Sequence, residues 1–213
     1  MQNFNKTILS ISLDTSIVLG DLSSSGLRQL SYAKHFENYV LVIISTSKDH
    51  LKSEYHFGNL HIYPTNVLFK PYAILKGLNL AKKLHEQYHF DVLTAQDPLA
   101  TGMIAAMAKR LLQIPLNIQL HSTYHYAPGW EDEAWSHMFW KRVIKPVLRR
   151  ADSVRVVSRI LVNQLKHDYS TIASKIVHIP VMVDLNYFYK RIKKKMDGLG
   201  MKNIKEFMMR QLI

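Results

Sequence analysis

Three short polar segments of this sequence combine residue types that can bind or transfer chemical groups. They are a serine-rich stretch ending at Ser25 and Gly26, a turn containing Asp97, and a stretch beginning at His121. Each lies between an apolar, strand-like run and a helical pattern. In an open parallel sheet, ligands bind outside the carboxyl ends of the strands, where loops and helix N-termini meet. We therefore expect the three segments to line one edge of a sheet.

The first segment offers hydroxyl and backbone N–H groups immediately before a predicted helix. Ser25 and Gly26 are able to contact a phosphate or a sugar, and an ordinary helix cap is the alternative. The sequence has no G-x-G-x-x-G and no G-x-x-x-x-G-K-[ST]. These absences argue against a nicotinamide dehydrogenase and against a P-loop nucleotidase.

The segment at His121 follows the predicted strand 114–120 and suits hydrogen bonding to a sugar hydroxyl or a peptide carbonyl. The polar residues after it are also candidates for the cleft: Ser122, Thr123 and Tyr124. His121 and His125 have the i,i+4 spacing of a helical metal site. The segment reads as a loop, however, with Pro and Gly just beyond it, so we expect no bound metal.

A chain of alternating short strands and helices is predicted, which is typical of βαβ units and a parallel sheet. The predicted strands are 7–14, 39–45, 60–63, 91–95, 114–120, 154–157 and 175–179. Asp97 is predicted to cap the helix that follows it, with Pro98 in the first turn. Ser158 is predicted to cap another helix. The fold class is α/β, a Rossmann-like three-layer sandwich with about seven mainly parallel strands.

The stretch Phe139–Arg150 mixes aromatic and apolar residues with five cations. A helix of this composition suits the surface of an anionic membrane. Apolar residues packed on the sheet with cations in water have the same composition, and the sequence leaves both alternatives open. Pro146 predicts a kink or a break in either case.

Positive charge is concentrated at the C-terminal end. The net charge is +12, and residues 189–213 hold eight Lys or Arg and two acidic residues, which is half of the excess. We expect a domain at 1–188 and a basic tail at 189–213. The absence of Cys excludes disulfides and thiol nucleophiles. The early apolar run is interrupted by Ser10 and Ser12 and ends in Asp14, so it does not predict a signal peptide.

Several motifs together resemble family 4 GT-B glycosyltransferases. The segments FDVLTAQDP (90–98), ADSVRVVS (151–158) and IPVMVD (179–184) followed by Phe188 are similar to the acceptor-side domain and to the hinge that follows it. The opening ISLD (11–14) is similar to a subset of the family. The matches run in the family order across residues 7–188.

The resemblance implies transfer of a hexose from a UDP- or GDP-sugar to a glycan or lipid-linked acceptor, without a cofactor or an essential metal. It implies that Ser25 and Gly26 approach the donor diphosphate and that His121, as the catalytic-site histidine, contacts the transferred sugar. Asp97, Ser158 and residues 122–124 are then acceptor or cleft candidates. In this sequence Ser-Gly stands where the family has paired glycines.

The resemblance ends about 25 residues before the end of the sequence, and nothing in the tail resembles the second, donor-binding domain. We therefore expect a truncated half enzyme of cell envelope glycan biosynthesis, inactive alone. It is expected in the cytoplasm or on the inner face of the membrane, with contact through Phe139–Arg150 and the tail. The alternative is a non-catalytic module whose tail binds anionic membrane or nucleic acid, and no motif predicts specific nucleic-acid recognition.

Overall fold

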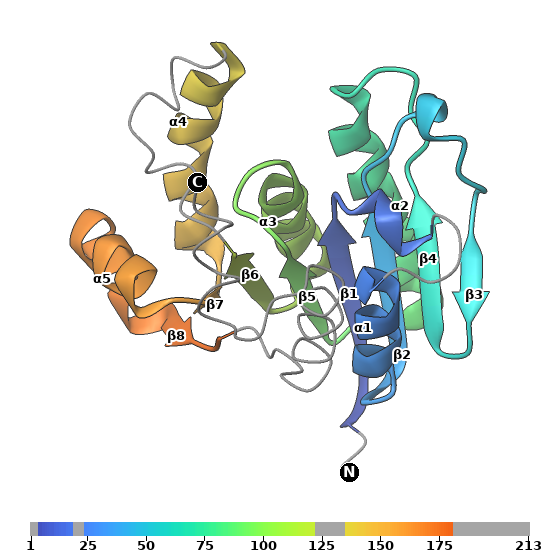
Figure 1. Cartoon of the computed structure of the whole chain (residues 1–213), viewed down its shortest axis with the longest axis horizontal. Helices are drawn as coiled ribbons and strands as arrows, with labels where there is room; N and C mark the ends of the chain where they lie inside the picture. Colours follow the sequence, from blue (N-terminus) through green and yellow to red (C-terminus); the bar gives the residue numbers. More distant parts are fainter. Residues whose placement is uncertain (1–3, 19–23, 122–134, 181–213) are drawn as a thin grey trace, which may run out of the picture. The chain divides into compact units, whose positions relative to one another are not determined.

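The fold is a twisted sheet flanked by helices, as the computed structural model shows for residues 4–18, 24–121 and 135–180 (Figure 1). The strand order in this part of the chain is β3-β4-β2-β1-β5-β6-β7-β8, and all neighbouring pairs are parallel except β3 with β4. The strands are β1 (Phe4–Ser12), β2 (Phe36–Ile43), β3 (Tyr55–Phe57), β4 (Leu60–Pro64), β5 (Val92–Ala95), β6 (Leu116–Leu120), β7 (Ser153–Val156) and β8 (Ile176–His178).

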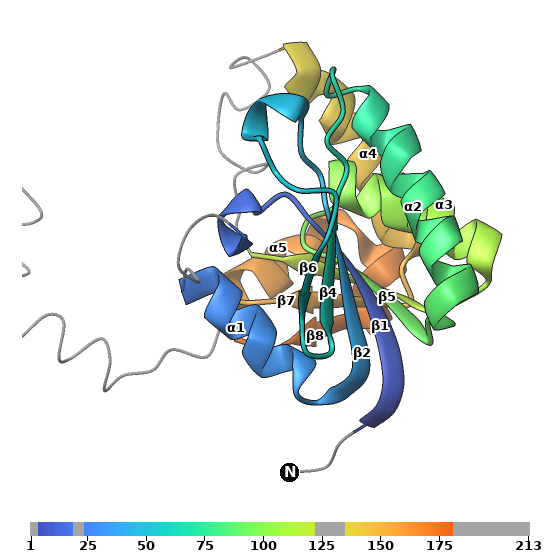
Figure 2. The ribbon, with the colours of Figure 1, turned by 90° about the vertical axis from the view of Figure 1, so that its right-hand side faces the viewer.

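Helices connect the parallel strands and cover the sheet. They are α1 (Ser24–Ala33), α2 (Tyr72–Tyr88), α3 (Ala100–Leu112), α4 (Trp135–Arg150) and α5 (Arg159–Asp168), with short 3-10 turns η1 (Thr15–Ile17), η2 (Ser47–Asp49) and η4 (Ser170–Lys175). Helices α2, α3 and α4 lie on one face, and α1 lies on the other (Figure 2). This is the Rossmann-like sandwich that the sequence predicts.

The continuous apolar run of β2 is explained by burial on both faces of the sheet. Val40 and Val42 belong to the larger core under α2, α3 and α4. Leu41 and Ile43 belong to a second core, which α1 closes with Ala33. Successive side chains of a strand point to opposite faces, so the buried part of β2, residues 39–43, is apolar on both faces, while the partly exposed start of the strand carries Glu37 and Asn38.

Three details of the predicted elements are wrong. Strand β3 was not predicted, because it has only three residues and its one partner is β4. Strand β2 begins at Phe36, three residues before the predicted start at 39. The helix after β5 begins at Ala100, two residues later than its predicted start at Pro98.

The chain divides into two units after Ile179, and the fold described above is that of the first unit. The predicted domain boundary at residue 188 and the basic tail lie outside the described residues. Both therefore stay predictions.

Candidate functional site

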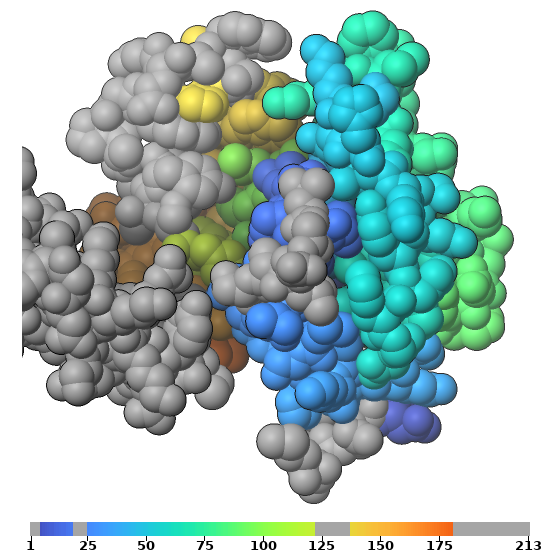
Figure 3. Space-filling view, turned by 45° about the vertical axis from the view of Figure 1, so that its right-hand side comes forward, coloured from blue at the N-terminus to red at the C-terminus, as the bar shows by residue number. Residues whose placement is uncertain are grey.

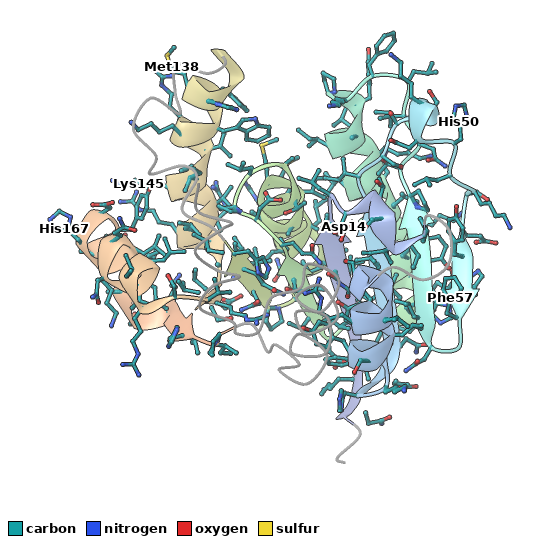
Figure 4. The ribbon with its side chains drawn as sticks, viewed as in Figure 1. Asp14, His50, Phe57, Met138, Lys145 and His167 are labelled. Atoms are coloured by element: carbon teal, nitrogen blue, oxygen red, sulfur yellow. The ribbon has the colours of Figure 1, made fainter. Side chains whose placement is uncertain are left out.

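The site lies where the order of the strands reverses its direction along the sheet. From β1 the chain runs outward through β2 and β4, and it then returns to the other side of β1 to form β5. In sheets of this kind the loops at such a point diverge and ligands bind in the crevice between them, so we call the carboxyl ends of β1 and β5 the β1–β5 crevice. Asp14 lies there, at the end of β1 (Figure 4).

Asp14 connects the end of β1 to the start of α1. Its carboxylate accepts hydrogen bonds from the Ser16 backbone N–H (3.0 Å), the Ser16 hydroxyl (2.5 Å) and the Ser25 hydroxyl. Partial burial raises the pKa of this carboxyl, but the hydrogen bonds and the nearby Arg28 outweigh burial and lower the pKa. Asp14 is therefore an anion at neutral pH and holds the loop after β1 against the start of α1.

A second set of hydrogen bonds extends this connection to β5. The Ser12 hydroxyl donates to the Gln96 side-chain carbonyl at 2.9 Å and accepts from the Asp14 backbone N–H at 3.0 Å. The Gln96 backbone N–H donates to the Ile11 carbonyl at 3.2 Å. The loops on both sides of the crevice are thus fixed to each other by polar contacts.

Ser25 and Gly26, the predicted phosphate-loop residues, lie in the first turn of α1. The Ser25 hydroxyl is nearly buried and donates to Asp14, so its direct role is structural. The N-terminal turn of a helix carries partial positive charge and favours an anionic ligand. The backbone of this turn, rather than the serine hydroxyl, is the group suited to a diphosphate.

Asp97 does not cap α3 as predicted, because Leu99 is the N-cap residue. Its carboxylate accepts from the Leu99 backbone N–H at 2.7 Å, and the Thr101 hydroxyl donates to its backbone carbonyl at 3.0 Å. Burial raises the pKa of the Asp97 carboxyl, against the lowering effect of hydrogen bonds from Thr101 and Leu99. A Cβ atom on Gly102 would lie 2.6 Å from the Asp97 carbonyl oxygen, so the turn and the helix require glycine there.

His121 follows the last residue of β6, at the same edge of the sheet, and is exposed to solvent. Partial burial of the ring lowers its pKa, and the positive charges of Arg155 and Arg28 lower it further. The imidazole is therefore neutral at physiological pH, and two cations from β7 and α1 act on it. Sequence reasoning missed both arginines.

Polar side chains also line the face of β5, β6 and β7 on the side opposite the larger core. The Gln119 amide donates to the Thr94 hydroxyl at 2.9 Å, and Arg155 donates to the Gln119 carbonyl at 3.1 Å. Asn117 donates to the Ser153 hydroxyl at 2.7 Å. Because side chains alternate along β6, His121 continues this polar row toward the crevice.

The remaining predicted residues divide into two groups. Ser158 is the N-cap of α5 as predicted, accepting from the Leu161 backbone N–H at 3.2 Å, which gives it a structural role. Ser122, Thr123 and Tyr124 lie outside the described residues. Within the described ranges, no group of three or more His, Cys, Asp or Glu is placed to hold a metal ion.

The two halves of helix α4, which contains Phe139–Arg150, differ in their packing. Ile144, Val147 and Leu148 are buried in the larger core, so the second half of the helix packs on the sheet side. Met138 and Phe139 remain half exposed near its start. The helix continues through Pro146 without a break. No helix in the described part of the chain is long and apolar enough to cross a membrane.

Solved structures share this architecture at low sequence identity. Sucrose-phosphate synthase from Thermosynechococcus elongatus is similar with a TM-score of 0.65 and 12% identity, covering 85% of this chain and 49% of that one. The HepE protein of Anabaena in complex with UDP-glucose is similar with a TM-score of 0.57 and 16% identity, and the match covers 92% of this chain and 50% of that one. UDP-GlcNAc 2-epimerase from Methanocaldococcus jannaschii is similar with a TM-score of 0.53 and 14% identity, and the match covers 82% of this chain and 45% of that one.

The fold is thus one Rossmann-like half of the GT-B type, and this chain spans about half the length of these three proteins. The family profile of Glycosyltransferase Family 4 matches residues 31–187, most of the chain. The chain therefore belongs to glycosyltransferase family 4. A search of curated protein sequences found no match.

Proposed function

We propose that this chain is the acceptor-side half of a nucleotide-sugar-dependent glycosyltransferase that transfers a hexose to a glycan or lipid-linked acceptor of the cell envelope. The observation that carries the proposal is His121, neutral and exposed beside the β1–β5 crevice, with Arg28 and Arg155 acting on it. Membership of family 4 and the UDP-glucose bound to a structure of the same fold support a UDP- or GDP-sugar as donor.

Each candidate residue has a role that follows from its chemistry. The neutral imidazole of His121 donates or accepts a hydrogen bond at a hydroxyl of the transferred sugar. The first turn of α1, at Ser25 and Gly26, faces the diphosphate, whose negative charge the helix N-terminus and Arg28 favour. Asp97 and Ser158, with residues 122–124, contribute to the acceptor side. No cofactor or metal is part of the proposal.

These 213 residues by themselves are proposed to bind substrate without transferring sugar. The support is that the solved GT-B structures are about twice as long as the part this chain matches. Ligand sites occur preferentially at domain interfaces, where one half supplies only part of the contacts. Release of UDP or GDP from the corresponding sugar nucleotides by the pure chain would contradict this part of the proposal.

The binding site is tested by two-dimensional NMR with UDP-glucose and with GDP-mannose. We expect the largest shifts at the backbone amides of Ser25 and Gly26 and at the His121 ring. Replacement of His121 by Ala is expected to reduce the shifts, while replacement of His167, an exposed histidine of α5, serves as the control. Shifts confined to other surfaces would contradict the proposed site.

The alternative is a non-catalytic module whose residues 189–213 bind anionic membrane or nucleic acid. Its support is that this segment holds eight Lys or Arg and only two acidic residues. The test is deletion of 189–213, followed by salt-dependent retention on anionic vesicles and on DNA. Retention that is unchanged by the deletion would rule the alternative out.

A further inference from the structure

The segment just before α2 and the first turn of α2 together expose four large apolar side chains. The exposed fractions are 74% for Leu68, 66% for Phe69, 62% for Tyr72 and 57% for Leu75. The rings of Phe69 and Tyr72 lie 6.4 Å apart between centroids. We call residues 68–76 the α2 rim. Contiguous exposed apolar surface on a protein marks a site of interaction with another apolar surface.

The exposure of the α2 rim is not a consequence of poor packing in the core. Ala73, Gly77, Ala81 and Leu84 form the buried side of α2. Tyr72, Leu75 and Lys76 fall between these positions, on the side of the helix directed away from the core, where polar residues are expected. The helix therefore has one apolar side that packs on the sheet. In its first turns it has a second apolar side, which is exposed and available to a binding partner.

Cations surround the apolar residues of the α2 rim. Lys70 and Lys76 are within it, and Lys48 of η2 is also exposed. Figure 3 shows η2 beside the start of α2, and the bridge between Thr46 and Val67 fixes the two segments together. The one acidic neighbour on η2, Asp49, uses its carboxylate on Thr46 at 2.6 and 3.0 Å.

A second exposed apolar group lies at the same edge of the sheet. Figure 4 labels Met138 at the start of α4 and His50 in the turn beside the α2 rim. Both residues lie at the end of the molecule toward which β1 points. Phe139 is half exposed there, next to the exposed cations Lys141 and Arg142. The candidate functional site opens at this edge as well.

We propose that the α2 rim docks on an anionic phospholipid bilayer, inserting Leu68 and Phe69 at the level of the headgroups while Lys48, Lys70 and Lys76 contact lipid phosphates. Apolar side chains interleaved with lysine, in a chain of net charge +12, match a surface that is negative outside and apolar beneath. Docking holds the crevice next to the membrane. It does not depend on which sugar donor the chain binds.

The test is co-sedimentation of the purified chain with vesicles of phosphatidylcholine and phosphatidylglycerol, compared with phosphatidylcholine alone. We expect binding to the anionic vesicles and about tenfold weaker partition for Leu68→Ser/Phe69→Ser, because two large apolar side chains no longer enter the lipid. Lys70→Glu/Lys76→Glu is expected to weaken partition at least as much and to reduce its dependence on salt.

Matched controls separate docking from general charge and hydrophobicity. Ile160→Ser replaces a residue of α5 that is 73% exposed, and Lys82→Glu reverses a charge on α2 about 9 Å further along the helix than Lys76. Neither control is expected to change partition more than about twofold. Equal binding of the rim variants and the wild type would overturn the proposal, as would equal losses in the controls.

A second copy of the chain is the competing occupant of the α2 rim. Self-association that is abolished by Leu68→Ser/Phe69→Ser, without vesicle binding by the wild type, would overturn the membrane proposal in favour of a dimer. Circular dichroism of every variant shows whether the fold is retained. Surface substitutions at such exposed positions are expected to change stability little.

Discussion

Replacement of Asp14 by Ala tests whether this carboxylate holds the β1 loop against the start of α1. The substitution removes the acceptor for the Ser16 N–H and hydroxyl and leaves the nearly buried Ser25 hydroxyl without its partner. Loss of a cap costs about 1 kcal/mol and an orphaned buried hydroxyl about 1–2 kcal/mol. We expect the free energy of unfolding to fall by about 2–3 kcal/mol.

For a chain of this length, that loss corresponds to a melting temperature lower by about 4–12 °C. The assays are thermal unfolding by circular dichroism and an NMR spectrum of the Ser25 and Gly26 amides, which should shift as the turn loosens. The matched control is Asp49→Ala, which removes a similar set of bonds to Thr46 in η2, at a cost of about 1 kcal/mol. This control should leave the Ser25 and Gly26 resonances in place.

The pH dependence supplies an independent check of the same carboxylate. Because the folded state lowers the pKa of Asp14, its contribution to stability is complete above the usual pKa of 3.8 and is lost as pH falls through the lowered value. The difference in unfolding free energy between wild type and Asp14→Ala should therefore narrow only in that acidic range. A melting temperature equal to that of Asp49→Ala, with unmoved Ser25 and Gly26 resonances, would refute the reasoning.

Three further predictions concern the packing and charge around the crevice. Gly102→Ala should destabilise the chain by about 1–3 kcal/mol in urea unfolding and disturb the amide of Asp97, since the added Cβ would lie 2.6 Å from the Asp97 carbonyl oxygen; an unchanged midpoint would contradict it. Pro146→Ala should raise the free energy of unfolding by about 1–2 kcal/mol, because proline is unfavourable inside a continuous helix, and a loss of stability would count against this. Arg155→Gln should raise the pKa of His121 in an NMR titration of the imidazole, because a nearby positive charge is removed, and an unchanged or lower pKa would exclude this electrostatic influence of Arg155.

Apolar periodicity was sufficient to predict most of the sheet. The apolar run 39–43 of β2 is buried, and β6 (LNIQL) alternates buried apolar residues with polar ones, so their hydrophobic patterns alone mark both strands. Strand β3 escaped detection because its three residues have no such pattern, and only pairing with β4 makes them a strand. Local sequence carries no record of a partner that lies elsewhere in the chain.

The same limit applies to the site. Ser25 and His121 were predicted because they fall next to the ends of elements, which the sequence pattern locates. The bond from Ser25 to Asp14 joins residues 11 positions apart through a loop whose course the sequence does not fix. Arg28 and Arg155 were missed because their approach to His121 depends on the placement of α1 and on the register of β6 with β7.

The central claim is that the β1–β5 crevice binds a nucleotide sugar, and an NMR titration with UDP-glucose at millimolar concentration tests it most directly. The account predicts saturable shifts that are largest at the Ser25 and Gly26 amides and at the His121 ring. It also predicts that Asp14→Ala weakens them and Asp49→Ala does not. Saturation with the largest shifts elsewhere, or no shift at these three residues, would contradict the account.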